Sequence, residues 1–87
     1  MISNGSIVEL SNNKKYIITD SSTQNGDIYY LSLELNYDTE MPKDETVFFK
    51  QNGKHSLLKI TNESDIDFLK DVFINKFLAN YNDEEIS

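Results

Sequence analysis

The chain has 87 residues, no cysteine and a formal net charge of -7. A chain of this length suits one domain that buries roughly 60–65% of its unfolded surface, which leaves little room for a deep catalytic cleft. Its composition excludes disulfides, thiolate nucleophiles and cysteine-based zinc sites, and the absence of arginine excludes bidentate recognition of phosphate or guanine.

Three asparagine-glycine pairs, at 4–5, 25–26 and 52–53, punctuate the first two thirds of the chain. Both residue types tolerate positive φ, so each pair is typical of a tight turn beside antiparallel strands. The intervening residues predict strands over 6–10, 15–21, 28–35, 46–51 and 56–61. Residues 36–45 contain the single proline and four acids, and they predict a loop.

Residues 28–35 alternate with a period of two, which indicates a strand with one buried face. One face carries Tyr29, Leu31, Leu33 and Leu35, and the other carries Ile28, Tyr30, Ser32 and Glu34. Adjacent aromatic residues, Tyr29 with Tyr30 and Phe48 with Phe49, must point to opposite faces. The outward ring of each pair therefore packs under a loop or the helix, or it lies exposed for binding.

The apolar period changes to that of a helix over residues 64–81. One side of the helical wheel carries Ile66, Leu69, Phe73 and Phe77, with Ile74 and Tyr81 nearby, and Phe68, Val72 and Leu78 widen this stripe. Residues 82–87 contain three consecutive acids and are expected to fray. The elements together predict a single α+β domain over 1–87: about five mostly antiparallel strands in a curled meander sheet, packed by one C-terminal helix.

His55 is the only residue that titrates near neutrality, which makes it the obvious candidate for acid-base chemistry. We expect it to be exposed beside a hairpin turn, where no pocket orients a substrate. The sequence contains no nucleophile motif, EF-hand loop or phosphate-binding loop. We therefore expect no enzyme, no metal and no cofactor, with a hydrolase that uses His55 as the enzymatic alternative.

No stretch approaches the roughly 18 apolar residues of a membrane span, and the N-terminus lacks the basic region and apolar run of a secretory signal. We expect a cytoplasmic protein with no membrane contact. The pI near 4.4 also argues against direct binding to nucleic acid, because a polyanion would be repelled.

The charge is unevenly distributed along the chain. Residues 27–45 hold six acids against one lysine, residues 46–62 hold three lysines and no acid, and residues 63–87 hold seven acids against two lysines. Clustered carboxylates beside a tyrosine can imitate the negative charge of nucleic acid and occupy a basic groove, although a charge run is more often a solvated surface. The predicted partner-binding face contains Asp27, Tyr30, Glu34, Asp38, Glu40, Asp44 and Glu45, and the second acidic block contains Asp65, Asp67, Asp71, Asp83, Glu84 and Glu85.

The opening residues 2–10, followed by residues 15–20 and by Asn25-Gly26 before Tyr29-Tyr30-Leu31, resemble small acidic uncharacterised proteins of low-GC Gram-positive bacteria and their phages. That resemblance implies strands, an acidic middle and a closing helix, but it implies no activity and no site residue. In size and acidity alone, the chain is also similar to phage-encoded inhibitors such as anti-CRISPR proteins.

We expect a non-enzymatic inhibitor, encoded by a phage or mobile element, whose acidic surface blocks a basic, nucleic-acid-binding site on a host defence protein. The alternative is a bacterial accessory or immunity-type protein that binds one cognate partner and uses its acidity for solubility only. The oligomeric state stays open between a monomer and a homodimer.

Overall fold

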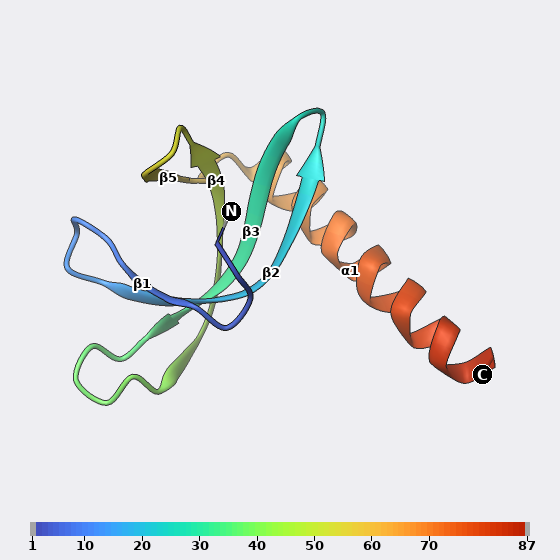
Figure 1. Ribbon diagram of the computed structural model, residues 1–87, viewed down its shortest axis with the longest axis horizontal. Coiled ribbons are helices and arrows are strands. Elements are labelled where there is room, and N and C mark those ends of the chain that lie inside the picture. Colours follow the sequence, from blue (N-terminus) through green and yellow to red (C-terminus); the bar gives the residue numbers. More distant parts are fainter. Residues whose placement is uncertain (1, 87) are drawn as a thin grey trace.

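The structure is a computed structural model that describes the backbone of residues 2–86 and the side chains of residues 2–80. The elements are β1 (Ile7–Glu9), β2 (Lys15–Gln24), β3 (Asp27–Leu35), β4 (Pro42–Asn52), β5 (Ser56–Lys59) and α1 (Glu63–Ile86). The strands form one antiparallel sheet in the order β1-β2-β3-β4-β5. The sheet curls into a half-barrel, and α1 crosses its outer face and continues beyond it (Figure 1). The predicted α+β class and meander topology are confirmed.

Turn chemistry and two irregularities shape the sheet. Asn25 and Gly26 have φ of 52° and 85°, so this pair forms the tight turn between β2 and β3 that the sequence predicts. The register shifts between Ile18 and Asp20 in β2 and between Leu33 and Leu35 in β3. Such bulges bend a strand and increase its twist, which accounts for the curl of the sheet.

The predicted loop over 36–45 ends earlier than expected. Residues 42–45 belong to β4, where Pro42 pairs with Leu35 at the start of the strand. Proline is tolerated at the first position of a strand because its missing N–H is not needed there. The acids Asp44 and Glu45 therefore lie on a strand, with exposed side chains.

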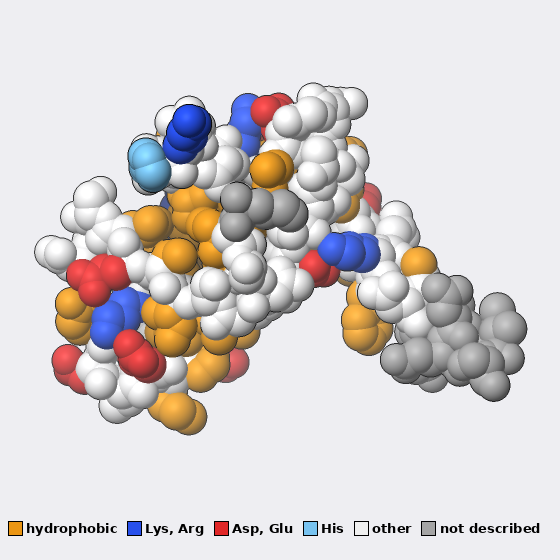
Figure 2. Space-filling view, in the orientation of Figure 1, with side chains coloured by type: hydrophobic (Ala, Val, Ile, Leu, Met, Phe, Trp, Pro, Cys, Tyr) orange, Lys and Arg blue, Asp and Glu red, His pale blue; other side chains and the backbone are white. Residues whose placement is uncertain are grey.

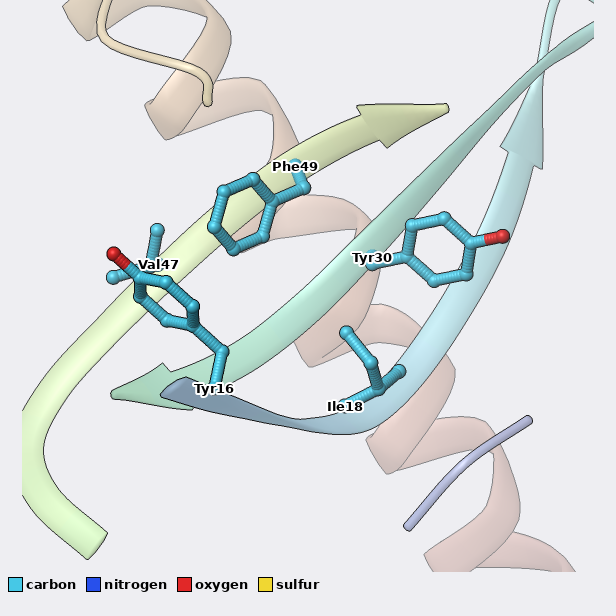
Figure 3. Close-up of a cluster of buried hydrophobic side chains, with 5 residues drawn as sticks. All are labelled: Tyr16, Ile18, Tyr30, Val47 and Phe49. Atoms are coloured by element: carbon cyan, nitrogen blue, oxygen red, sulfur yellow. The ribbon is translucent and has the colours of Figure 1, made fainter. Parts of the chain in front are cut away.

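The concave face of the sheet holds a core that needs no helix. This core consists of Tyr16 and Ile18 from β2, Tyr30 from β3, and Val47 and Phe49 from β4, whose side chains gather on the same face of the sheet (Figure 3). The Tyr16 and Phe49 rings meet edge to face with centroids 5.0 Å apart. The curl therefore lets three strands bury their own inward side chains.

The convex face has a second core, which α1 completes. Leu69 and Phe73 of α1 pack on Phe48 of β4, and the half-buried Tyr29 and Leu31 of β3 surround them. Both members of each adjacent aromatic pair are thus covered, one on each face of the sheet. The prediction that only one face of β3 is buried is wrong, because the curl covers one face and the helix covers the other.

Helix α1 is longer than the predicted span of 64–81, since it begins at Glu63 and ends at Ile86. The Asn62 carboxamide oxygen accepts hydrogen bonds from the backbone N–H groups of Ser64 and Asp65 and so caps its start. Phe77, predicted on the packed side of the helix, is 67% exposed. Leu69 and Phe73, in the first half of α1, make its buried contacts with the sheet, and the C-terminal part of the helix continues beyond the sheet (Figure 1). The side chains of 81–87 lie outside the described residues, so the fraying of 82–87 stays a prediction.

Candidate partner-binding surface

Tyr30 does not belong to the surface, contrary to its predicted place on the partner-binding face. Its side chain is 0% exposed in the concave core. The hydroxyl donates a hydrogen bond to Oε1 of Gln51 at 2.9 Å and accepts one from the backbone N–H of Ile2 at 3.1 Å. The predicted alternation in β3 is present, and it places Tyr30 in the concave core, with Tyr29 and Leu31 on the opposite face.

Glu34 is also buried, with 7% of its surface exposed, so it does not belong to the predicted partner-binding face. Its carboxylate accepts a hydrogen bond from Nζ of Lys43 at 2.8 Å and lies 3.9 Å from Nζ of Lys14. The hydrogen bond from Lys43 is the main cause that holds the pKa of Glu34 below its usual range, against the opposing effect of burial. Glu34 is therefore a neutralised structural carboxylate and offers little charge to a partner.

Two further members of the predicted face are paired with lysines. Nζ of Lys50 lies 3.5 Å from Asp27, and Nζ of Lys15 donates to Glu40 at 2.9 Å. The hydrogen bond to Glu40 is the main cause that raises the pKa of Lys15. These lysines cancel much of the negative charge of Asp27 and Glu40. Three residues of the predicted face remain exposed and form no ion pair among residues 2–80: Asp38, Asp44 and Glu45.

The second acidic block is placed on α1. Asp65, Asp67 and Asp71 are exposed and have no ion-pair partner within the part of the chain whose side chains are described. Asp67 and Asp71 are four residues apart, so they share one side of the helix at about 6 Å along its axis. The side chains of Asp83, Glu84 and Glu85 lie outside the described residues.

A groove runs along one side of α1, between the helix and the convex face of the sheet. It consists of two cavities of about 490 and 370 Å³ that share Thr46, Phe48 and Lys70. The first cavity also reaches Glu45, Lys59, Ile60 and Ile66, and the second reaches Leu31, Phe73, Ile74 and Phe77. We call this feature the α1 groove.

The floor of the α1 groove is aromatic. The rings of Phe48 and Phe73 stack there with centroids 6.0 Å apart, and both residues are buried. On the ridge beside it, Ile74 and Leu78 are 54% and 46% exposed. Hydrophobic side chains are visible on α1 where it leaves the sheet (Figure 2). The groove thus adjoins a helix surface that its own sheet does not cover.

Sequence reasoning did not identify the α1 groove, although a signal was present. Phe68, Ile74 and Leu78 place apolar residues on sides of the helix other than the one packed on the sheet. A helix that packs on a single sheet needs an apolar stripe on one side only. The excess of apolar residues indicates that more of α1 is suited to burial than its own sheet buries.

His55 is exposed, as the sequence predicts, and it lies at the rim of a cleft on the concave side. The cleft separates β1 from the β4–β5 turn and is lined by Ile2, Val8 and Leu57 together with His55. The side chain of His55 is exposed, and no side chain among residues 2–80 forms a hydrogen bond or ion pair with it. A general base is normally oriented by such a partner, and this cleft supplies none to His55.

Within the described residues, no three metal-ligating side chains gather at one place. The described part of the chain also contains no helix with the length and apolar character that a membrane span requires. No protein-family model matches the chain, and comparisons with curated proteins and with solved structures give no significant match.

Proposed function

We propose that this protein is a non-enzymatic inhibitor that binds a partner protein through its acidic surface and covers a basic, nucleic-acid-binding site of that partner. One observation carries the proposal: a set of exposed carboxylates has no ion-pair partner among residues 2–80. The set consists of Glu9, Asp38, Asp44, Glu45, Glu63, Asp65, Asp67 and Asp71.

The pairing pattern divides the acids into two classes with different electrostatic reach. Asp20, Asp27, Glu34 and Glu40 each lie within 4.0 Å of a lysine, so their fields are largely cancelled at a distance. The unpaired acids project the negative potential of a chain whose net charge is -7. Such a potential attracts a basic surface over a distance of about one Debye length and repels nucleic acid itself.

The direct test is capture from a lysate of the bacterium that carries the gene or its prophage. We expect a nucleic-acid-binding protein to be retained at about 50 mM salt and released at about 500 mM, because salt screens exposed charges. The purified partner should then lose its DNA or RNA when this protein is added. Retention that does not depend on the salt concentration would contradict the proposal. So would a partner that still binds its nucleic acid after this protein is added.

Paired and unpaired acids provide a matched comparison. The double variant D44N/E45Q removes two unpaired charges, and D27N/E40Q removes two paired ones, so both change the net charge equally. We expect D44N/E45Q to weaken capture at low salt by about ten-fold and D27N/E40Q to weaken it far less. Equal effects would mean that total charge matters and the unpaired surface does not.

A second candidate function is favoured by the α1 groove: an accessory or immunity-type protein that binds one cognate partner mainly through apolar contacts. For such a protein the acids serve solubility, and D44N/E45Q leaves binding unchanged. Neighbouring genes separate the two, since a toxin gene favours immunity and phage early genes favour an inhibitor directed at host defence.

A further inference from the structure

We propose that the α1 groove binds an amphipathic helix of the partner, with apolar residues on one side and lysine or arginine on its flanks. This inference rests on the proposed function, since it names the segment that the acidic surface receives.

The shape of the groove suits a helix. Its lining on α1 extends from Ile66 to Phe77, and the eleven helical steps between these two residues span about 16 Å, or three turns. A helix of the same length laid beside α1 would present residues i, i+3 or i+4, and i+7 to the floor formed by Phe48 and Phe73. The groove is open and already formed, so little rearrangement is needed.

The charges at the edges of the groove select a basic occupant. Glu45 lies at the edge on β4, while Asp67 and Asp71 lie on α1 beside the groove. Lys59 and Lys70 also line the groove, so the three carboxylates of Glu45, Asp67 and Asp71 exceed these two lysines by one charge. Basic residues on both flanks of an inserted helix would meet carboxylates that have no ion-pair partner within the described side chains.

A second copy of this chain is a poorer occupant. Each copy has a net charge of -7, so the same edge acids would face like charges across a symmetric contact. A partner helix with lysines meets the same apolar floor and gains attraction instead of repulsion.

The test uses a fluorescein-labelled 18-residue peptide of leucine and lysine, ordered so that leucines occupy one helix face, and a scrambled peptide of identical composition. Fluorescence anisotropy at about 50 mM salt is expected to show binding of the ordered peptide at least ten-fold tighter than that of the scrambled one. Ile74→Ser should weaken the ordered peptide by about five-fold, the loss expected for half-burying an isoleucine.

Phe68→Ser is the matched control, because Phe68 is 49% exposed on the same helix but does not line the groove. It should leave the affinity unchanged. Thr46→Lys places a bulky cation in the groove from the strand side and should weaken the ordered peptide as strongly as Ile74→Ser. Circular dichroism of each variant establishes that the fold is retained.

The outcomes separate this inference from the proposed function. If the two peptides bind equally, and D67N/D71N weakens both while Ile74→Ser weakens neither, the groove inference is wrong and the acidic-surface function stands. If neither peptide binds at low salt, both are contradicted. A dimer in analytical ultracentrifugation that Ile74→Ser dissociates would show that a second copy occupies the groove, which also overturns the inference.

Discussion

The concave and convex faces of the sheet bury apolar side chains in different ways. On the concave face, residues from β2, β3 and β4 meet one another because the sheet curls, and the polar atoms among them find partners within the same space. On the convex face a single helix covers the sheet, and its cover stops where α1 runs past the edge (Figure 1). We therefore expect the self-closing face to make the more stable core, while the helix-covered face leaves apolar side chains of α1 exposed near acids.

The largest expected effect lies on the concave face. Phe49→Ala removes a ring that is 1% exposed and packed on Tyr16, so we expect a loss of about 4 kcal/mol in the free energy of unfolding. Urea denaturation measures the loss. Leu58→Ala on the neighbouring strand is the control, because Leu58 is 50% exposed and should cost less than about 1 kcal/mol. Similar losses for both variants would refute the view that the concave face holds the main core.

The second-largest loss in the free energy of unfolding is expected on the convex face. Leu69→Ala removes the most buried side chain among residues 63–80 of α1 and should cost about 3 kcal/mol. Because the concave core does not use α1, we expect amide hydrogen exchange to accelerate in the helix well before it accelerates in β2 to β4. Uniform acceleration in the helix and in β2 to β4 would show that the two faces unfold as one unit.

A smaller, pH-dependent effect is expected at Glu34. The pKa of Glu34 is lowered in the folded state, mainly by the hydrogen bond from Lys43. The ionised carboxylate therefore contributes fully to the free energy of unfolding above pH 4.5, the ordinary carboxyl pKa. This contribution is lost as the pH falls through the lower pKa of the folded state. Glu34→Gln should therefore cost about 1 kcal/mol at pH 7 and progressively less below pH 4.5, since Lys43 is half exposed and screened. Urea unfolding of both proteins at pH 7, 5, 4 and 3 measures the difference.

Glu40→Gln is the control for this titration, because it removes the same charge from an exposed ion pair with Lys15. It should show a smaller loss at pH 7, because the Glu40 side chain is 47% exposed, against 9% for that of Glu34. A constant difference between Glu34→Gln and the unchanged protein across this range would mean that Glu34 contributes by packing and not by its charge.

The order of elements followed well from the sequence, because its signals are local. The Asn25-Gly26 pair forms the predicted turn through its two positive φ angles, and the helix begins at Glu63, one residue before the predicted start. The predictions that proved wrong concern features that the local sequence does not determine. The period of two in β3 is equally compatible with either face turned inward, and the curl of the sheet buried Tyr30 and Ser32 on the concave side.

The candidate site was less predictable than the fold for a related reason. The sequence shows where acids cluster along the chain, but not which of them meet a lysine. Glu34 lies 9 residues from Lys43, and Asp20 meets Lys76 across 56 residues. Such pairings depend on register and on the path of α1, so Asp38, Asp44 and Glu45 stayed available while their neighbours were neutralised.

By itself, the sequence of this protein determined the class of fold, the turns and the presence of a terminal helix, because turn chemistry and apolar period act over a few residues. Only the tertiary structure decided which face of each strand is buried, which carboxylates keep their charge exposed, and that a groove opens beside α1. Those features arise from the bulge-driven curl of the sheet and from the direction in which the helix crosses it, and both are set by contacts between distant parts of the chain.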